Sequence, residues 1–229
     1  MPSLSLEEPQ LVQRALVGLH DAVLRFVAGH FPPEASILDC GAGTGAWAAA
    51  LQARGYRGVH AIDLDAASFG ASAPFAPVDL NLPFADAVAS AFGPKPFDLI
   101  TAIEVIEHLE SPSLFLRQCR QLLAPGGALV LTSPNPESAP ARLTFLATGR
   151  LRHFDRHGDP THITPMFPAL LARIAPGCGF TLESIVPIPH ERTFPCIRAW
   201  KRTIARGAAR LLSGHTRGDC NLFVLNPLL

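Results

Sequence analysis

Two groups of residues in this 229-residue chain have types and spacing that suit chemistry. The first is the glycine-rich run 39–45, with the sequence DCGAGTG, which directly follows the short apolar run 36–40. Glycines allow a sharp turn and let a ligand approach the main chain closely. Asp63 ends the next apolar run, where a carboxylate ~20 residues after the glycines can accept hydrogen bonds from a ribose. This arrangement predicts a site for a nucleoside-containing cofactor.

The second group is Glu104, Glu107 and His108, which follow another apolar run. The spacing i, i+3 and i+4 predicts that they share one face of a helical turn. Two carboxylates and an imidazole can chelate a divalent metal or supply a general base. His162 precedes a predicted helix and is a further candidate for this site. His153 and His157 are interpreted as residues of a polar lid that hydrogen-bond locally.

The elements that must position these residues alternate between strand and helix. Such alternation predicts an α/β fold with a mostly parallel sheet. The expected strands are 36–40, 59–63, 75–79, 98–102, 128–133, 180–186 and 220–225. The expected helices are 9–30, 46–54, 113–123, 139–148, 166–175 and 197–212.

Composition limits the classes of protein that remain. Hydrophobic residues make up 48% and charged residues 17%, which suits a sizeable core and excludes a disordered chain. Lys plus Arg and Asp plus Glu are both 19, so overall charge argues against a nucleic acid partner. Five cysteines without Cys-x-x-Cys spacing favour reduced thiols and a cytoplasmic location. We identify no signal peptide and no apolar run of ~18 residues.

The motifs between residues 36 and 135 resemble, in order and spacing, those of class I S-adenosylmethionine-dependent methyltransferases. Beside the glycine run, the similar segments are VHAIDLD, PVDLNLPF, FDLITAIEVIEHLESP and LLAPGGALVLTSPNP. A nicotinamide-binding pattern would place a third glycine where Ala46 stands, which argues against a dehydrogenase. The resemblance implies a Rossmann-like seven-stranded sheet with helices on both faces and an antiparallel last strand between the fifth and sixth.

The resemblance also implies roles for individual residues. Gly41 and Gly43 would lie against the methionine end of S-adenosylmethionine, with Asp39 on its ammonium side. Asp63 would bind the ribose. The adenine would contact Leu64, Asp79 and Leu80. The chain is expected to be one methyltransferase domain, 1–229, divided into an N-terminal helix (1–35), a cofactor-binding core (36–135), an acceptor lid (136–178) and the last two strands with an inserted basic helix (179–229).

The implied reaction is methylation of a small-molecule acceptor, on oxygen rather than nitrogen. Glu104, Glu107, His108 and His162 are the candidate catalytic residues and also the candidate ligands of a divalent metal. The EVIEH segment is shared by ubiquinone-pathway O-methyltransferases and by small-RNA terminal 2′-O-methyltransferases, which hold magnesium there. A metal-dependent RNA-end methyltransferase and a non-catalytic cofactor-binding protein therefore stay open as alternatives.

The C-terminal part of the chain carries an excess of positive charge. Residues 1–139 have a net charge of −7 and residues 140–229 a net charge of +7. The predicted helix 197–212 is amphipathic and basic, with an arginine every four residues from Arg198 to Arg210 and an apolar stripe through Trp200 and Ile204. It either packs on the sheet with a solvated arginine face or contacts an anionic surface, and peripheral membrane contact is one such expectation. The sequence leaves the oligomeric state open.

Overall fold

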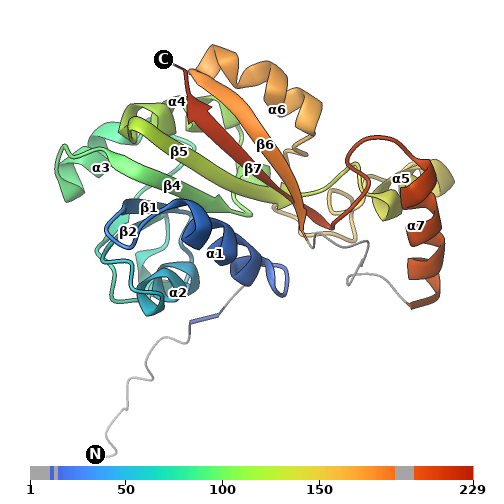
Figure 1. Ribbon diagram of the computed structural model, residues 1–229, viewed down its shortest axis with the longest axis horizontal. Coiled ribbons are helices and arrows are strands. Elements are labelled where there is room, and N and C mark those ends of the chain that lie inside the picture. The colour runs from blue at the N-terminus through green and yellow to red at the C-terminus, as the bar shows by residue number, and fades with distance from the viewer. Residues whose placement is uncertain (1–10, 13–14, 189–198, 229) are drawn as a thin grey trace, which may run out of the picture.

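A seven-stranded sheet forms the centre of the computed structural model, which describes residues 11–12, 15–188 and 199–228 (Figure 1). The strand order is β3-β2-β1-β4-β5-β7-β6. Strands β1 to β5 are parallel, whereas β7 pairs antiparallel with both β5 and β6. The predicted α/β sheet and the place of its antiparallel last strand are thus confirmed. The strands are β1 Ser36–Cys40, β2 Gly58–Asp63, β3 Phe75–Pro77, β4 Phe97–Ile103, β5 Leu123–Pro134, β6 Phe180–Ile188 and β7 Cys220–Pro227.

Helices cover both faces of the sheet because the strands are apolar on both sides. One face packs against α3, α4 and α6 and the other against α1 and α2 (Figure 1). Two further helices, α5 and α7, lie side by side at one end of the sheet. The helices are α1 Leu19–His30, α2 Ala46–Ala53, α3 Ala85–Phe92, α4 Pro112–Leu122, α5 Ala139–Thr148, α6 Pro168–Ile174 and α7 Ala199–Leu211. None of these described helices combines the length and apolar character needed to cross a membrane.

The prediction of one helix over residues 9–30 is wrong in its first half. Helix α1 begins only at Leu19, because Gly18 adopts a left-handed φ of 81° that interrupts helical geometry. The described residues before Gly18 are not helical. Residues 9–10 and 13–14 lie outside the described part, as do 197 and 198 at the start of the predicted basic helix. Helix α3 was not predicted, since its eight residues include few large apolar side chains to mark a period.

Candidate functional site

A cavity of about 450 Å³ opens at the carboxyl ends of β1, β2 and β4. Ligands of α/β proteins gather at this edge because the loops after parallel strands converge there. The residues predicted to hold the cofactor all line this cavity, namely Asp39, Gly41, Gly43, Asp63, Leu64, Asp79 and Leu80. Val12 and Ala15, which precede α1, also line the cavity. These two residues were expected in the N-terminal helix and were not assigned to the site.

The glycine run makes a turn that only glycine fits without strain. Gly41, Gly43 and Gly45 have φ values of 73°, 53° and 85°, in the left-handed region. A Cβ on Gly41 would lie 2.5 Å from Cγ2 of Val105, so the turn also packs closely against the segment after β4. The Gly43 amide donates a hydrogen bond of 2.8 Å to Oδ2 of Asp63, which fixes the turn to the end of β2.

Asp39 is a buried carboxyl group at the floor of the cavity. Its Oδ1 lies 3.5 Å from the Thr101 hydroxyl, while Oδ2 has no hydrogen-bond partner among the described residues. Burial, and then the charge of Asp63, raise the pKa of Asp39 to about 8. A cation placed against Oδ2 would restore the ionised form, so this group fits the ammonium of S-adenosylmethionine.

Glu107, His108 and His162 come together beside this cavity. Each offers one ligand atom, and these atoms lie within 4.8 Å of one another. Glu107 is fully buried, and neither of its carboxylate oxygens has a hydrogen-bond partner among the described residues. Burial therefore raises the pKa of Glu107 well above its usual range. A buried carboxylate without partners beside two imidazoles suits a divalent metal, which would compensate its charge.

Hydrogen bonds assign the tautomer of His108. The Thr161 hydroxyl donates its one proton to Oδ1 of Asp159 at 2.6 Å, so it can only accept from Nδ1 of His108 at 2.9 Å. The Thr161 carbonyl, another acceptor, lies 3.2 Å from the same nitrogen. Nδ1 of His108 therefore carries the proton, and Nε2 keeps its lone pair. Burial lowers the pKa of His108, which favours this neutral form.

His162 has the same arrangement at its ring. Its Nδ1 lies 3.0 Å from the carbonyl oxygen of His153, which can only accept, so Nδ1 carries the proton and Nε2 is available.

Thr161 and Asp159 were not predicted as site residues. The sequence does contain a signal for them, because an aspartate two positions before a threonine is typical of a turn that the aspartate side chain closes. In the structure, Oδ1 of Asp159 accepts a hydrogen bond from the Thr161 amide at 2.9 Å.

The structure does not bring Glu104 into the cluster of Glu107, His108 and His162. Glu104 has a φ of 53°, and only Ile106–His108 form a 3-10 turn, so the expected single helical face does not exist. Its carboxylate instead accepts from the Leu16 amide at 3.0 Å and the Cys220 thiol at 3.1 Å. Glu104 still lines the cavity and holds the segment before α1 across it.

The predicted lid segment 136–178 divides into three parts. Helix α5 leaves the sheet and contacts α7. The chain then returns to the site, where the amides of Ile163 and Thr164 each donate to the Glu107 carbonyl at 2.9 Å. Helix α6 packs into the hydrophobic core rather than over the cavity. A second cavity of about 300 Å³ lies beside the first and shares Glu104, Asp159 and His162 with it.

A mostly parallel sheet with a glycine turn after β1 and an acidic residue at the end of β2 is typical of Rossmann-like proteins that bind a nucleoside cofactor. Comparison with known proteins makes this assignment specific. Residues 12–185 match a family described as a methyltransferase domain. The chain belongs to this family and has the fold and site motifs of a class I S-adenosylmethionine-dependent methyltransferase.

Individual relatives agree with this family. A ubiquinone biosynthesis O-methyltransferase of Psychrobacter arcticus is 31% identical over 68% of this chain, but the match spans less than two thirds of that protein, 62%. The Xanthomonas axonopodis protein of the same name is 27% identical over 78% of this chain and 77% of its own length. An S-adenosylmethionine-dependent methyltransferase structure from Archaeoglobus fulgidus has a TM-score of 0.63 at 19% identity and covers 93% of this chain and 95% of its own, which shows a common fold.

Proposed function

We propose that this protein transfers a methyl group from S-adenosylmethionine to a hydroxyl oxygen of a small-molecule acceptor. When bound, the cofactor supplies an electrophilic methyl group. The observation that carries the proposal is the neutral His108, which lines the cofactor cavity and whose ring lies 4.7 Å from that of His162, a residue that also lines the second cavity. The name of the Psychrobacter and Xanthomonas relatives, ubiquinone biosynthesis O-methyltransferase, supports an oxygen acceptor.

The cofactor roles follow from charge and position. Asp39 would take the ammonium group, because its unpartnered Oδ2 is buried at the cavity floor. Asp63 would bind the ribose at the end of β2, and Leu64 at the rim would cover the adenine. Asp79 would accept from the adenine amino group, while Leu80 offers its backbone and packs into the core beneath.

The chemical role of His108 is that of a general base. Nε2 would accept the proton of the acceptor hydroxyl as the hydroxyl oxygen bonds to the methyl carbon, and the broken sulfur–carbon bond would leave its electron pair on S-adenosylhomocysteine. The positive charge that develops on the ring is stabilised through Nδ1–H, Thr161 and the carboxylate of Asp159. Asp159 and Thr161 thus act as positioning residues, and they fix the tautomer that leaves Nε2 free.

A second candidate function makes the same cluster a metal site. Glu107, His108 and His162 would hold a divalent cation through one carboxylate oxygen and one ring nitrogen of each histidine. A cation there would lower the pKa of an acceptor hydroxyl and make a separate base unnecessary. This function includes the metal-dependent methylation of an RNA end, which the cluster and the basic half of the chain favour.

The test is methyl transfer from labelled S-adenosylmethionine to a panel of phenols, alcohols and short RNAs, with and without EDTA. We expect transfer in EDTA, and a turnover ~10-fold or more lower for Thr161→Val, with unchanged affinity for S-adenosylhomocysteine. Thr181→Val, an exposed threonine on β6, is the matched control and should behave as wild type. Loss of transfer in EDTA would favour the metal function, and methylation of RNA ends alone would exclude a small-molecule acceptor. Binding of S-adenosylhomocysteine without transfer to any acceptor would indicate a non-catalytic cofactor-binding protein.

A further inference from the structure

Helices α5 and α7 form a two-helix lobe at one end of the sheet, which we call the α5/α7 lobe (Figure 1). The two helices meet through small side chains, and the buried cluster between them consists of Ala139, Ala205 and Ala209. The larger side chains of Phe145, Leu146, Ile204 and Leu211 are not part of this cluster. Their positions decide what the outer surface of the lobe can bind.

These four apolar side chains are exposed to solvent. On α7, Ile204 is 56% and Leu211 89% exposed, and their separation of seven residues places them on one face of the helix. On α5, Phe145 is 57% and Leu146 84% exposed. The sequence alone left open whether the apolar stripe of this helix packs on the sheet. In the structure Ile204 and Leu211 face outward, and the alanines face α5.

The charge of the lobe has one sign. Helix α7 contains Lys201, Arg202, Arg206 and Arg210, and neither α5 nor α7 contains an aspartate or a glutamate. Helix α5 contains Arg142, which pairs with Glu137, just before that helix, at 3.7 Å. Arg206 and Arg210 are exposed. The lobe thus exposes leucine, isoleucine and phenylalanine as well as arginines. An anionic membrane offers partners to both kinds of side chain, because negatively charged headgroups cover its apolar interior.

We propose that the α5/α7 lobe docks peripherally on anionic phospholipid bilayers. Two other occupants fit less well. A nucleic acid backbone would pair with the arginines but would leave the exposed apolar side chains in water. A second copy of the chain would bring two lobes of the same charge together, with no acidic residue in α5 or α7 to compensate.

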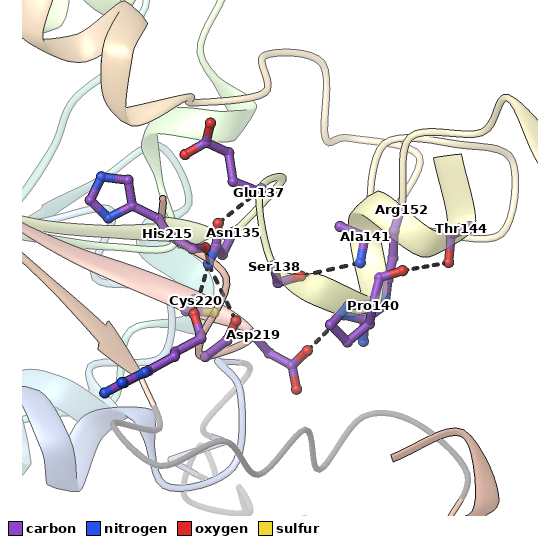
Figure 2. Close-up of polar contacts among 12 residues, drawn as sticks. Asn135, Glu137, Ser138, Pro140, Ala141, Thr144, Arg152, His215, Asp219 and Cys220 are labelled. Carbon is purple, nitrogen blue, oxygen red and sulfur yellow. Dashed lines mark hydrogen bonds and ion pairs between the residues drawn. The ribbon is translucent and has the colours of Figure 1, made fainter. Parts of the chain in front are cut away.

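The lobe is fastened to the strands that carry the site (Figure 2). Nδ2 of Asn135, directly after β5, donates to the carbonyls of His215 and Arg217 at 2.8 Å each. Arg152 and Asp219, which directly precedes β7, form a largely buried ion pair of 2.6 Å. A docked lobe would therefore hold the second cavity, which Asp219 helps to line, near the membrane surface.

The experiment is co-sedimentation of the full chain with vesicles of phosphatidylcholine alone and of phosphatidylcholine mixed with phosphatidylglycerol. We expect binding to the mixed vesicles only, weakened by salt. The double substitution Arg206→Gln and Arg210→Gln should reduce partitioning roughly 30-fold, since each basic side chain near an anionic surface contributes about a factor of five. Replacing Phe145, Leu146 and Leu211 by serine should reduce it more than tenfold.

The matched control is Leu170→Ser, which removes an exposed leucine of α6 outside the lobe and should leave vesicle binding unchanged. Unchanged binding of S-adenosylhomocysteine by the lobe variants would show that they are folded. The proposal is wrong if wild-type protein ignores anionic vesicles or binds neutral ones equally. It is also wrong if the lobe variants bind anionic vesicles as well as the wild-type protein does. A dimer of the wild-type protein that light scattering detects and the serine variant loses, without vesicle binding by either, would assign the lobe to a second copy of the chain instead.

Discussion

At the scale of single residues, the structure buries ionisable groups beside the site in their neutral forms. His153 is the clearest case outside the glycine turn, with a φ of 74° and an Nε2 that lacks a partner among the described residues. Burial, and then the charge of Arg152, lower the pKa of His153 from 6.5 to about 4. The unfolded chain therefore binds more protons than the folded chain between these values, and stability falls as the pH falls.

This shift predicts the effect of His153→Asn on acid stability. Between pH 6.5 and 4, protonation of His153 should lower the free energy of unfolding of the wild-type protein by up to ~3 kcal/mol, and the variant should not show this loss. Asparagine tolerates the left-handed backbone conformation and does not titrate. Urea unfolding at several pH values measures the difference. The raised pKa of Asp39 has the opposite effect on the pH dependence of stability, but this effect is the same in the wild-type protein and the variant. His157→Asn removes an exposed histidine as the control, and an equal acid loss in all three proteins would contradict the prediction.

At the scale of elements, the turn between β1 and α2 depends on two separate properties of Gly41. Its φ of 73° requires glycine, and a Cβ would overlap the Val105 side chain. We expect Gly41→Ala to lower stability by ~2 kcal/mol or more and to weaken S-adenosylhomocysteine binding more than tenfold, as measured by urea unfolding and calorimetry.

Gly126→Ala separates the two properties. Gly126 has a φ of 79°, but a Cβ there would meet no atom within 4 Å, so only the backbone strain of about 1 kcal/mol applies. Cofactor affinity should not change, because Gly126 does not line the cavity. If Gly41→Ala matches Gly126→Ala in both stability and affinity, the contact with Val105 has no role in shaping the site.

The elements also show what sequence patterns can and cannot predict. The strand 36–40 and the helix 139–148 have the predicted bounds. The strand could be predicted because an apolar run that enters a glycine turn is a local signal. The cluster of Glu107, His108 and His162 was predicted, but its partner Thr161 was not, because that contact joins segments 53 residues apart. Glu104 lies outside this cluster because its left-handed φ overrides the helical spacing.

The outward face of α7 shows the same limit. Amphipathic spacing indicates that a helix has an apolar stripe, but not whether that stripe faces the protein. In α7 the contact with α5 is made by alanines, which the sequence pattern assigned to no special role. The side that a helix buries depends on the partner that the topology supplies, and here the partner is α5 rather than the sheet.

At the scale of the whole molecule, three buried clusters of very different size hold the described parts together. Two large clusters lie on either face of the sheet and share its strands, whereas the cluster between α5 and α7 consists of a few alanines. Because stability follows the apolar area that is buried, the α5/α7 lobe should open without unfolding of the sheet.

Hydrogen exchange measures this difference directly. Amides of α7 should exchange faster than those of β5 and β7, whose ladder lies between the two large clusters. The ends of the lobe should be better protected than its middle, since the Ala139 amide donates to the Thr216 carbonyl and the Thr216 hydroxyl to the Ala209 carbonyl. Anionic vesicles should slow exchange in α7 and leave α3, on a face of the sheet, unchanged. If α7 is as protected as β7 without vesicles, the lobe is part of one cooperative unit, and the alanine contacts contribute more than their area indicates.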